Sequence, residues 1–224
     1  MSKRADLKIP LRTLLICAAL FPQAAPAADA SFAFVPVREA LKAEKWDAAI
    51  EAGEKTVKEL PESSEAHLCL GRAYGQKARN ASIFSQMGLA RKCKAEFEKA
   101  VALDPKSVDA RYDLLTFHVN APGIAGGSLD KAREQAAEIA RLDPVRGHIA
   151  AGAVLSSEKK WPEAEAEYRK ALELKPDSAN LHWRLGRLFE KQGRKGDAIA
   201  EWRKALTLEP AHEGVKKDLS RMGG

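Results

Sequence analysis

Five prolines divide this chain of 224 residues into segments of similar length, and each follows a run of helix-forming residues. They are Pro61, Pro105, Pro144, Pro176 and Pro210, at intervals of 44, 39, 32 and 34 residues. Because proline lacks the backbone donor that would continue a helix, each is predicted to close a helical run. A period near 34 residues with such punctuation is typical of stacked helical hairpins. The sequence therefore predicts an all-α solenoid with a long concave surface.

The last two repeats define the pattern best, since residues 148–176 and 182–210 align without a gap. The positions that recur are His148/His182, Gly152/Gly186, Ala164/Ala198, Ala171/Ala205 and Pro176/Pro210, and Tyr168 aligns with Trp202. This pattern resembles the tetratricopeptide repeat, in which a first helix carries Gly and a second carries Ala, an aromatic residue and a second Ala. The resemblance implies an α-solenoid of about five helical hairpins.

The repeats set the predicted domain organisation. We expect a leader over residues 1–27, a repeat array over 28–210 and a C-terminal capping helix over 211–224. The hairpins are expected at about 36–63, 64–107, 108–146, 147–178 and 179–210. The third fits the pattern least well, because Leu115 replaces the Gly and Ala136 replaces the aromatic residue. In the capping helix, Val215, Leu219 and Met222 form one apolar face at helical spacing.

The first 27 residues have the organisation of a secretory signal peptide. A basic start precedes the short apolar run TLLICAALF, and Ala25-Pro26-Ala27 offers a small-residue cleavage site. We expect cleavage after Ala27 and a periplasmic or secreted protein, with Sec and twin-arginine export both open. The apolar run is too short to span a bilayer, so no transmembrane segment is expected after cleavage.

Removal of the leader lowers the net charge of the chain. The remaining sequence has 33 basic and 30 acidic residues, against 37 and 31 in the full chain. Without a dense cluster of Lys and Arg, nothing marks a phosphate-binding footprint. A nucleic-acid partner is therefore not expected.

Two cysteines, Cys69 and Cys93, follow the leader into what would be an oxidising compartment. The repeat register places Cys93 opposite Gly71 as a small core residue. Cys69 lies two residues before Gly71, about 200° away around the helix. We favour two free thiols, and a disulfide is the alternative.

The second repeat exceeds the standard length by ten residues, within QKARNASIFSQMGLARK. We expect both of its helices to be lengthened, with the bend near residues 80–82. Ile83, Phe84, Met87 and Leu89 could form an apolar seam there, which would suit self-association. The sequence thus leaves homo-oligomer formation open.

The third repeat exceeds the standard by five residues, within HVNAPGIAGGSLDKA. Pro122 and Gly123 predict a turn, and Gly126 and Gly127 allow backbone angles closed to other residues. The loop resembles a group of secreted bacterial tetratricopeptide proteins that share an APGI-x-GG motif, which implies architecture and not activity. A tight turn packed on the neighbouring extension is expected, and an anion cradle is the alternative.

No motif in the sequence predicts catalysis or metal binding. His67, His148 and His182 occupy the same position in three different repeats, so they cannot converge on one metal ion. We expect them to have packing or helix-start roles. The sequence has no nucleophile elbow, phosphate loop or paired-carboxylate motif. We expect no enzyme activity, no metal and no cofactor.

The resemblance also implies where a ligand would bind. In this family the ligand usually lies against the first helices, and the matching positions are Arg72, Gln76, Tyr112, Thr116, Asn120, Trp183, Arg187 and Lys191. Aromatic and Arg side chains are the usual anchors, which favours Tyr112, Trp183, Arg72 and Arg187. The predicted function is an exported interaction module or adaptor that binds a protein or peptide in its concave groove. The alternatives are a self-associating scaffold of the cell envelope, or a small-ligand or anion binder that uses the Gly126-Gly127 loop.

Overall fold

The computed structural model describes residues 33–223, and every regular element among them is helical. The predicted leader, residues 1–27, lies outside this range. The helices pair in sequence order, as expected. They are α2 (Val35–Lys42), α3 (Trp46–Glu59), α4 (Ser64–Asn80), α5 (Ile83–Leu103), α6 (Val108–Asn120), α7 (Leu129–Leu142), α8 (Pro144–Ser157), α9 (Trp161–Leu174), α10 (Ala179–Lys191), α11 (Lys195–Leu208) and α12 (Glu213–Met222), with a 3-10 helix η1 (Gly123–Ala125).

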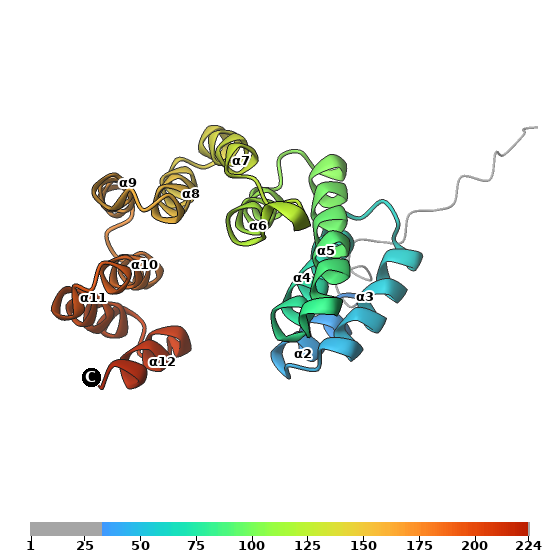
Figure 1. Ribbon diagram of the computed structural model, residues 1–224, viewed down its shortest axis with the longest axis horizontal. Helices are drawn as coiled ribbons and strands as arrows, with labels where there is room; N and C mark the ends of the chain where they lie inside the picture. Colours follow the sequence, from blue (N-terminus) through green and yellow to red (C-terminus); the bar gives the residue numbers. More distant parts are fainter. Residues whose placement is uncertain (1–32, 224) are drawn as a thin grey trace, which may run out of the picture.

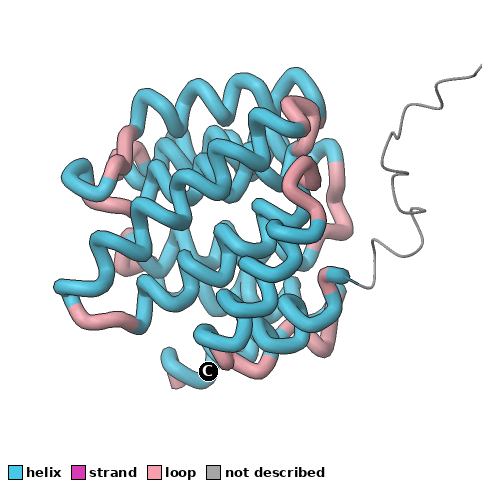
Figure 2. Tube along the Cα trace, turned by 90° about the vertical axis from the view of Figure 1, so that its right-hand side faces the viewer, coloured by secondary structure: helices cyan, strands magenta, loops and turns pink. Residues whose placement is uncertain are grey.

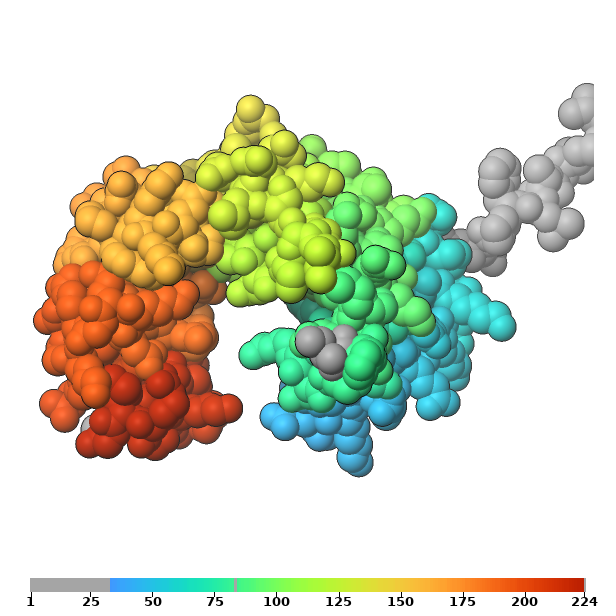
Figure 3. Space-filling model, in the orientation of Figure 1, coloured from blue at the N-terminus to red at the C-terminus, as the bar shows by residue number. Residues whose placement is uncertain are grey.

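The helical pairs form an arch. The first helices of the pairs, α4, α6, α8 and α10, lie on its inner side, and the second helices lie outside (Figure 1). A quarter turn away, the helices run side by side with their turns at the edges of the array (Figure 2). The space-filling view shows an open space between the N-terminal and C-terminal arms (Figure 3). The expected all-α solenoid with a concave face is confirmed.

Polar side chains fix where the first helices begin. Ser63, Ser107 and Ser178 each accept a hydrogen bond from the backbone N–H three residues further on, which caps α4, α6 and α10. Such caps satisfy N–H groups that have no partner within the helix. Since each serine lies two residues after a repeat proline, the same short segment ends one helix and starts the next.

Glycine and an aromatic ring hold the two helices of a hairpin together. A Cβ atom added to Gly71, Gly152 or Gly186 would lie 2.6, 2.7 or 2.3 Å from the nearest ring atom of Phe97, Tyr168 or Trp202, respectively. These rings are buried, so each glycine leaves the space that its ring fills. The close approach of the two helices at glycine is therefore made by the aromatic residue of the second helix.

The third repeat reverses this arrangement. Leu115 occupies the glycine position and Ala136 the aromatic position, and both belong to one buried cluster with Ile139, Ala150 and Val154. A large side chain on the first helix thus replaces a large side chain on the second. Because the exchange roughly conserves volume, the departure from the pattern leaves the array intact.

Pro144 follows the end of α7, as predicted, and it also begins α8, which was not predicted. Pro144 lies in the first turn of α8, and Asp143 is both the C-cap of α7 and the N-cap of α8, where it accepts a hydrogen bond from the N–H of Arg146 at 2.9 Å. Proline is tolerated at this position because its missing N–H would have no helical partner. α8 therefore begins inside the predicted third hairpin, and no loop separates it from α7.

The two lengthened repeats meet at one edge. α4 and α5 are 17 and 21 residues long and are joined at Ala81–Ser82, while η1 packs against α5.

Cys69 and Cys93 are both buried and free. The expected partner of Cys93 was wrong by one helical turn, because its Sγ lies opposite Gly75 and Phe97 takes the place opposite Gly71.

The C-terminal helix closes the array as predicted. Val215 and Leu219 are buried in the cluster that contains Trp202, and Met222 packs against that cluster. His212 caps the helix by accepting a hydrogen bond from the N–H of Val215. α12 therefore lies where the first helix of a further repeat would lie, at the open end of the arch (Figure 1).

Candidate functional site

A hollow of about 300 Å³ opens on the concave side, between the first helices of three consecutive repeats. α6 and α10 supply most of its lining, and α8 lies between them. The lining residues are Tyr112, Leu115, Thr116, Val119, Asn120, Ala153, Ser156, Tyr168, Trp183, Arg184, Arg187, Leu188 and Lys191. Within the described residues, this is the place where the predicted binding positions gather.

Six of the eight predicted binding residues line this hollow: Tyr112, Thr116, Asn120, Trp183, Arg187 and Lys191. The other two, Arg72 and Gln76, lie on α4 outside it. Arg72 donates a hydrogen bond from Nε to Asp113 Oδ2 at 2.5 Å, so this predicted anchor is engaged by α6. The prediction of Arg72 as an anchor did not include this partner, which lies 41 residues further along the chain.

The charges that line the hollow are all positive. Arg184, Arg187 and Lys191 come from α10, and no Asp or Glu is among the lining residues. Arg184 donates from Nε to the neutral amide of Asn180 at 2.7 Å, and Lys191 Nζ lies 3.4 Å from Ser156 Oγ. Neither cation has an ion-pair partner among the described residues. Burial, followed by the charge of Arg187, lowers the pKa of Lys191, and the opposing charge of Glu190 does not offset the two.

Tyr112 lies between two guanidinium groups. Arg146 of α8 and Arg184 of α10 approach its ring with Cζ at 5.6 and 5.4 Å from the ring centroid. Contacts of this kind are favourable because the ring face is electronegative. Tyr112 thereby connects α6 with the next two repeats and holds Arg184 at the hollow.

Trp183 is held by the capping helix. Its Nε1 donates to Asp218 Oδ2 at 2.8 Å, and the same carboxylate oxygen lies 3.9 Å from Nε of Arg187. Arg187 also lies over the Trp183 ring at 5.2 Å, and the His212 ring lies 5.4 Å away. The indole N–H is therefore engaged within the chain, and only the ring of this predicted anchor faces the hollow.

The three repeat histidines form a series of hydrogen bonds within the hairpins. Nδ1 of His67, His148 and His182 lies 2.6, 2.7 and 2.7 Å from the carboxylate of Glu96, Glu167 and Glu201, respectively. Each glutamate directly precedes the aromatic residue that packs on the glycine. In the third repeat Arg111 donates to Gln135 instead, at 2.9 Å. The expected packing role of the histidines is thus a polar contact that fixes the hairpin.

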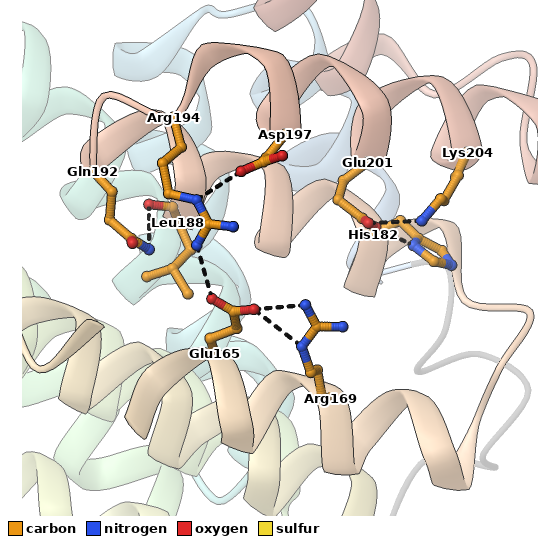
Figure 4. Close-up of polar contacts among 9 residues, drawn as sticks. All are labelled: Glu165, Arg169, His182, Leu188, Gln192, Arg194, Asp197, Glu201 and Lys204. Carbon is orange, nitrogen blue, oxygen red and sulfur yellow. Dashed lines mark hydrogen bonds and ion pairs between the residues drawn. The ribbon is translucent and has the colours of Figure 1, made fainter. Parts of the chain in front are cut away.

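Figure 4 shows the last of these pairs with its surroundings. Lys204 donates to the same glutamate, Glu201, at 2.8 Å. Nearby, Arg194 donates to Asp197 at 2.7 Å and to Glu165 of the preceding repeat at 3.1 Å (Figure 4). Sequence reasoning missed these pairs, although the glutamate before each aromatic residue was a visible signal. They stabilise the array on its outer side.

A second hollow, of about 490 Å³, lies over α8 between α7 and α9. It is larger, and its uncharged lining is mainly alanine and glycine, as α7 lacks the aromatic residue of the pattern. Its charged lining residues are paired, as Arg133 and Lys160 contact Glu158 and His148 contacts Glu167. Since these charges are already satisfied, the smaller concave hollow is the better candidate for a binding site.

The Pro122–Gly127 loop is a tight turn against α5. The N–H groups of Ala125 and Gly127 donate to Pro122 O, that of Gly126 donates to Gly123 O, and that of Ser128 donates to His118 O. Gly126 has a φ of +94°, and a Cβ on Gly127 would overlap the carbonyl oxygen of Ala121. Because these donors are engaged within the turn, they are not available to cradle an anion.

Two further properties concern the described residues alone. No helix between residues 33 and 223 combines the length and apolarity needed to cross a bilayer. Over the same range, no group of three or more His, Cys, Asp and Glu side chains is placed to hold a metal ion.

Three family profiles match the sequence. One described as TPR repeat matches residues 152–193, and two described as tetratricopeptide repeat match 71–107 and 179–212. No curated protein sequence matches the chain significantly.

Among solved structures, a thermophilic tetratricopeptide protein of Thermus thermophilus is similar to this chain. It is 21% identical with a TM-score of 0.68, and the match covers 86% of this chain and 98% of the other. A MamA structure from Desulfovibrio magneticus is 15% identical with a TM-score of 0.51, over 84% of this chain and 99% of the other. At these identities, the likeness concerns the fold.

Proposed function

We propose that this chain, which is a tetratricopeptide repeat protein, is an exported module that binds a protein or peptide segment along its concave face. The observation that supports this proposal is the hollow between α6, α8 and α10, which has aromatic walls and contains two cations, Arg184 and Lys191, without an ion-pair partner among the described residues. An extended or helical segment would lie across the first helices and place side chains in the hollow. Thr116 and Arg187 are exposed at its rim and accessible to such a segment.

Site-specific photo-crosslinking tests the binding face. A photoreactive amino acid would replace Thr116 on the concave side, and in a control chain it would replace Arg203, which is exposed on α11. We expect a protein partner to be crosslinked from position 116 and not from 203, with loss of the product on Asn120→Trp, which places a large ring at an exposed position of the hollow. Equal crosslinking from both positions would contradict concave-face binding.

Export is the second part of the proposal, and it rests on the sequence of residues 1–27. The basic start, short apolar run and Ala25-Pro26-Ala27 site are the supporting features. N-terminal sequencing and cell fractionation would test it. The expected result is a chain that begins at Ala28 in the envelope or medium, and an intact chain in the cytoplasm would contradict export.

A self-associating scaffold is the second candidate, and one observation favours it. Phe84, at the end of the lengthened α4–α5 hairpin, is 93% exposed. An apolar ring with this exposure to solvent is a candidate contact site for a second copy of the chain. Sedimentation velocity would decide: a dimer that becomes a monomer on Phe84→Asp supports the scaffold, and a monomeric parent chain excludes it.

A further inference from the structure

We infer that the concave hollow selects carboxylate-bearing peptides, in which an apolar side chain lies next to one or more acidic groups. This inference rests on the proposed function and specifies the chemistry of its ligand. It is carried by the position of three cations, Arg184, Arg187 and Lys191, of which the first and the last have no ion-pair partner among the described residues.

The three cations lie on one face of α10. They are spaced at i, i+3 and i+7, and residues at these intervals lie one above another along a helix. The row spans roughly 10 Å, since seven residues rise about 1.5 Å each. This length suits a short stretch of peptide that carries one to three carboxylates.

The nearby acids leave the cationic row largely uncompensated. Glu190 pairs with Arg221 of α12 at 2.5 Å. Asp218 also contacts Arg221, at 3.1 Å, and reaches only Arg187 within the row. The two ends of the row, Arg184 and Lys191, therefore stay unpaired among the described residues. Carboxylates, which donate no proton and accept several hydrogen bonds, are the peptide groups that such cations bind most strongly.

The rest of the hollow is apolar. Leu115 and Leu188 are buried at its base, and Val119 and Ala153 lie beside them. A volume of about 300 Å³ admits one large side chain or two small ones. The ligand is thus expected to place an apolar side chain between α6 and α10 while its carboxylates contact the row.

Peptide is favoured over nucleic acid. A phosphate backbone is bound by basic groups spread along a surface, with a phosphate every few ångströms. Here the unpaired cations that line the hollow lie on one helix, α10, and the chain beyond residue 27 has only three more basic than acidic residues. A short acidic peptide matches this confined charge better.

The test measures binding of immobilised peptide pools to the purified full chain. The pools share a degenerate apolar centre, and their flanks carry only glutamate, only glutamine or only lysine. Each glutamate pool is made with a free and with an amidated C-terminus, which separates side-chain carboxylates from the terminal one. A single-stranded oligothymidylate serves as the nucleic-acid probe.

We expect the glutamate pool to bind about tenfold more tightly than the glutamine pool, and the advantage to fall at high salt. The variant R184Q/K191Q is expected to lose this advantage. The control K195Q/R203Q removes the same charge from exposed positions on α11 and is expected to keep it. Because Arg184 also contacts Tyr112, the single variant K191Q, at an exposed residue, checks that the loss is not due to misfolding.

The possible failures are distinct. In the first, glutamine or lysine pools bind as well as the glutamate pool and lose binding on Asn120→Trp, at an exposed position of the hollow. This result would overturn the acidic preference and leave concave-face peptide binding in place. Binding of the oligothymidylate alone would overturn both. An acidic preference that R184Q/K191Q and K191Q retain would show that these cations are not the site.

Discussion

Alanine at Gly186 is expected to destabilise the protein, although alanine is the better helix former. Gly186 lies in α10, where replacement of glycine by alanine alone would contribute about 0.5–1 kcal/mol of stability. However, the new Cβ would lie 2.3 Å from Trp202 Nε1 and 2.4 Å from Cδ1, where ordinary contacts are 3.4–4 Å. The ring would have to shift by roughly 1 Å, yet Trp202 is completely buried.

The two effects can be weighed against each other. Overpacking of this kind costs about 1–3 kcal/mol. Displacement of the ring would also weaken the hydrogen bond from Trp202 Nε1 to Trp183 O, now 3.1 Å long, at a cost of about 1 kcal/mol. After subtraction of the gain in helix propensity, Gly186→Ala should lower the free energy of unfolding by about 2 kcal/mol. For a domain of this size, the melting temperature should fall by about 4–8 °C.

The chain provides a matched control. Gly88 also lies in a helix, α5, but no atom lies within 4 Å of its added Cβ. Gly88→Ala should therefore show the propensity gain alone and raise the melting temperature by about 1–4 °C. Thermal unfolding of both variants, followed by far-UV circular dichroism, measures the difference. If Gly186→Ala were as stabilising as Gly88→Ala, the requirement for glycine opposite the aromatic ring would be refuted.

Three further predictions concern the buried residues. Burial acts to raise the pKa of Glu201, but hydrogen bonds from lysine and histidine outweigh burial and hold this pKa below its ordinary value. The stability that these bonds contribute is present above about pH 4.3 and is lost as the pH falls through the lower pKa of the folded state. Glu201→Gln should therefore lower the urea midpoint at pH 7 and make the midpoint less dependent on pH in the acid range. Burial raises the pKa of Cys69 to about 11 and that of Cys93 to about 12, so a Cys17→Ser chain should react with Ellman's reagent at pH 8 only after unfolding. Leu115→Ala should cost about 3 kcal/mol in urea denaturation, and a loss below 1 kcal/mol would contradict its packing role in the third repeat.

Features that repeat along the chain could be predicted from the sequence. Since the last two repeats align without a gap, the faces of their helices correspond, and the inner positions could be named before the structure. Six of those positions meet at one hollow. The same logic predicted that a helix ends before Pro144, but it did not predict that α8 begins at Pro144 without a loop, because proline is compatible with both positions.

Contacts between distant segments could not be predicted in this way. Arg72 and Asp113 lie 41 residues apart, and Trp183 and Asp218 lie 35 apart. The pattern places Arg72 and Trp183 on the inner face but contains nothing about which acid reaches them. A side chain at an inner position is therefore not necessarily available to a ligand.

Arg184 shows what a different reading of the sequence would have found. The positions transferred from the tetratricopeptide pattern omit the residue two before the glycine, which is Arg184 in α10. A search for cations at i, i+3 and i+7 would have grouped it with Arg187 and Lys191. Helical periodicity alone thus identifies the charged row, whereas the family pattern identifies two of its three members.

The capping helix determines how much of that row remains for a ligand. α12 closes the apolar end of the array through Val215 and Leu219. Its polar face brings Asp218 to Trp183 and Arg187, and Arg221 to Glu190. Arg221 engages Glu190, the acid nearest to Lys191 in sequence, so the helix that completes the core also leaves Lys191 without an ion-pair contact among the described residues. Folding of the C-terminus and the charge of the concave hollow are therefore coupled.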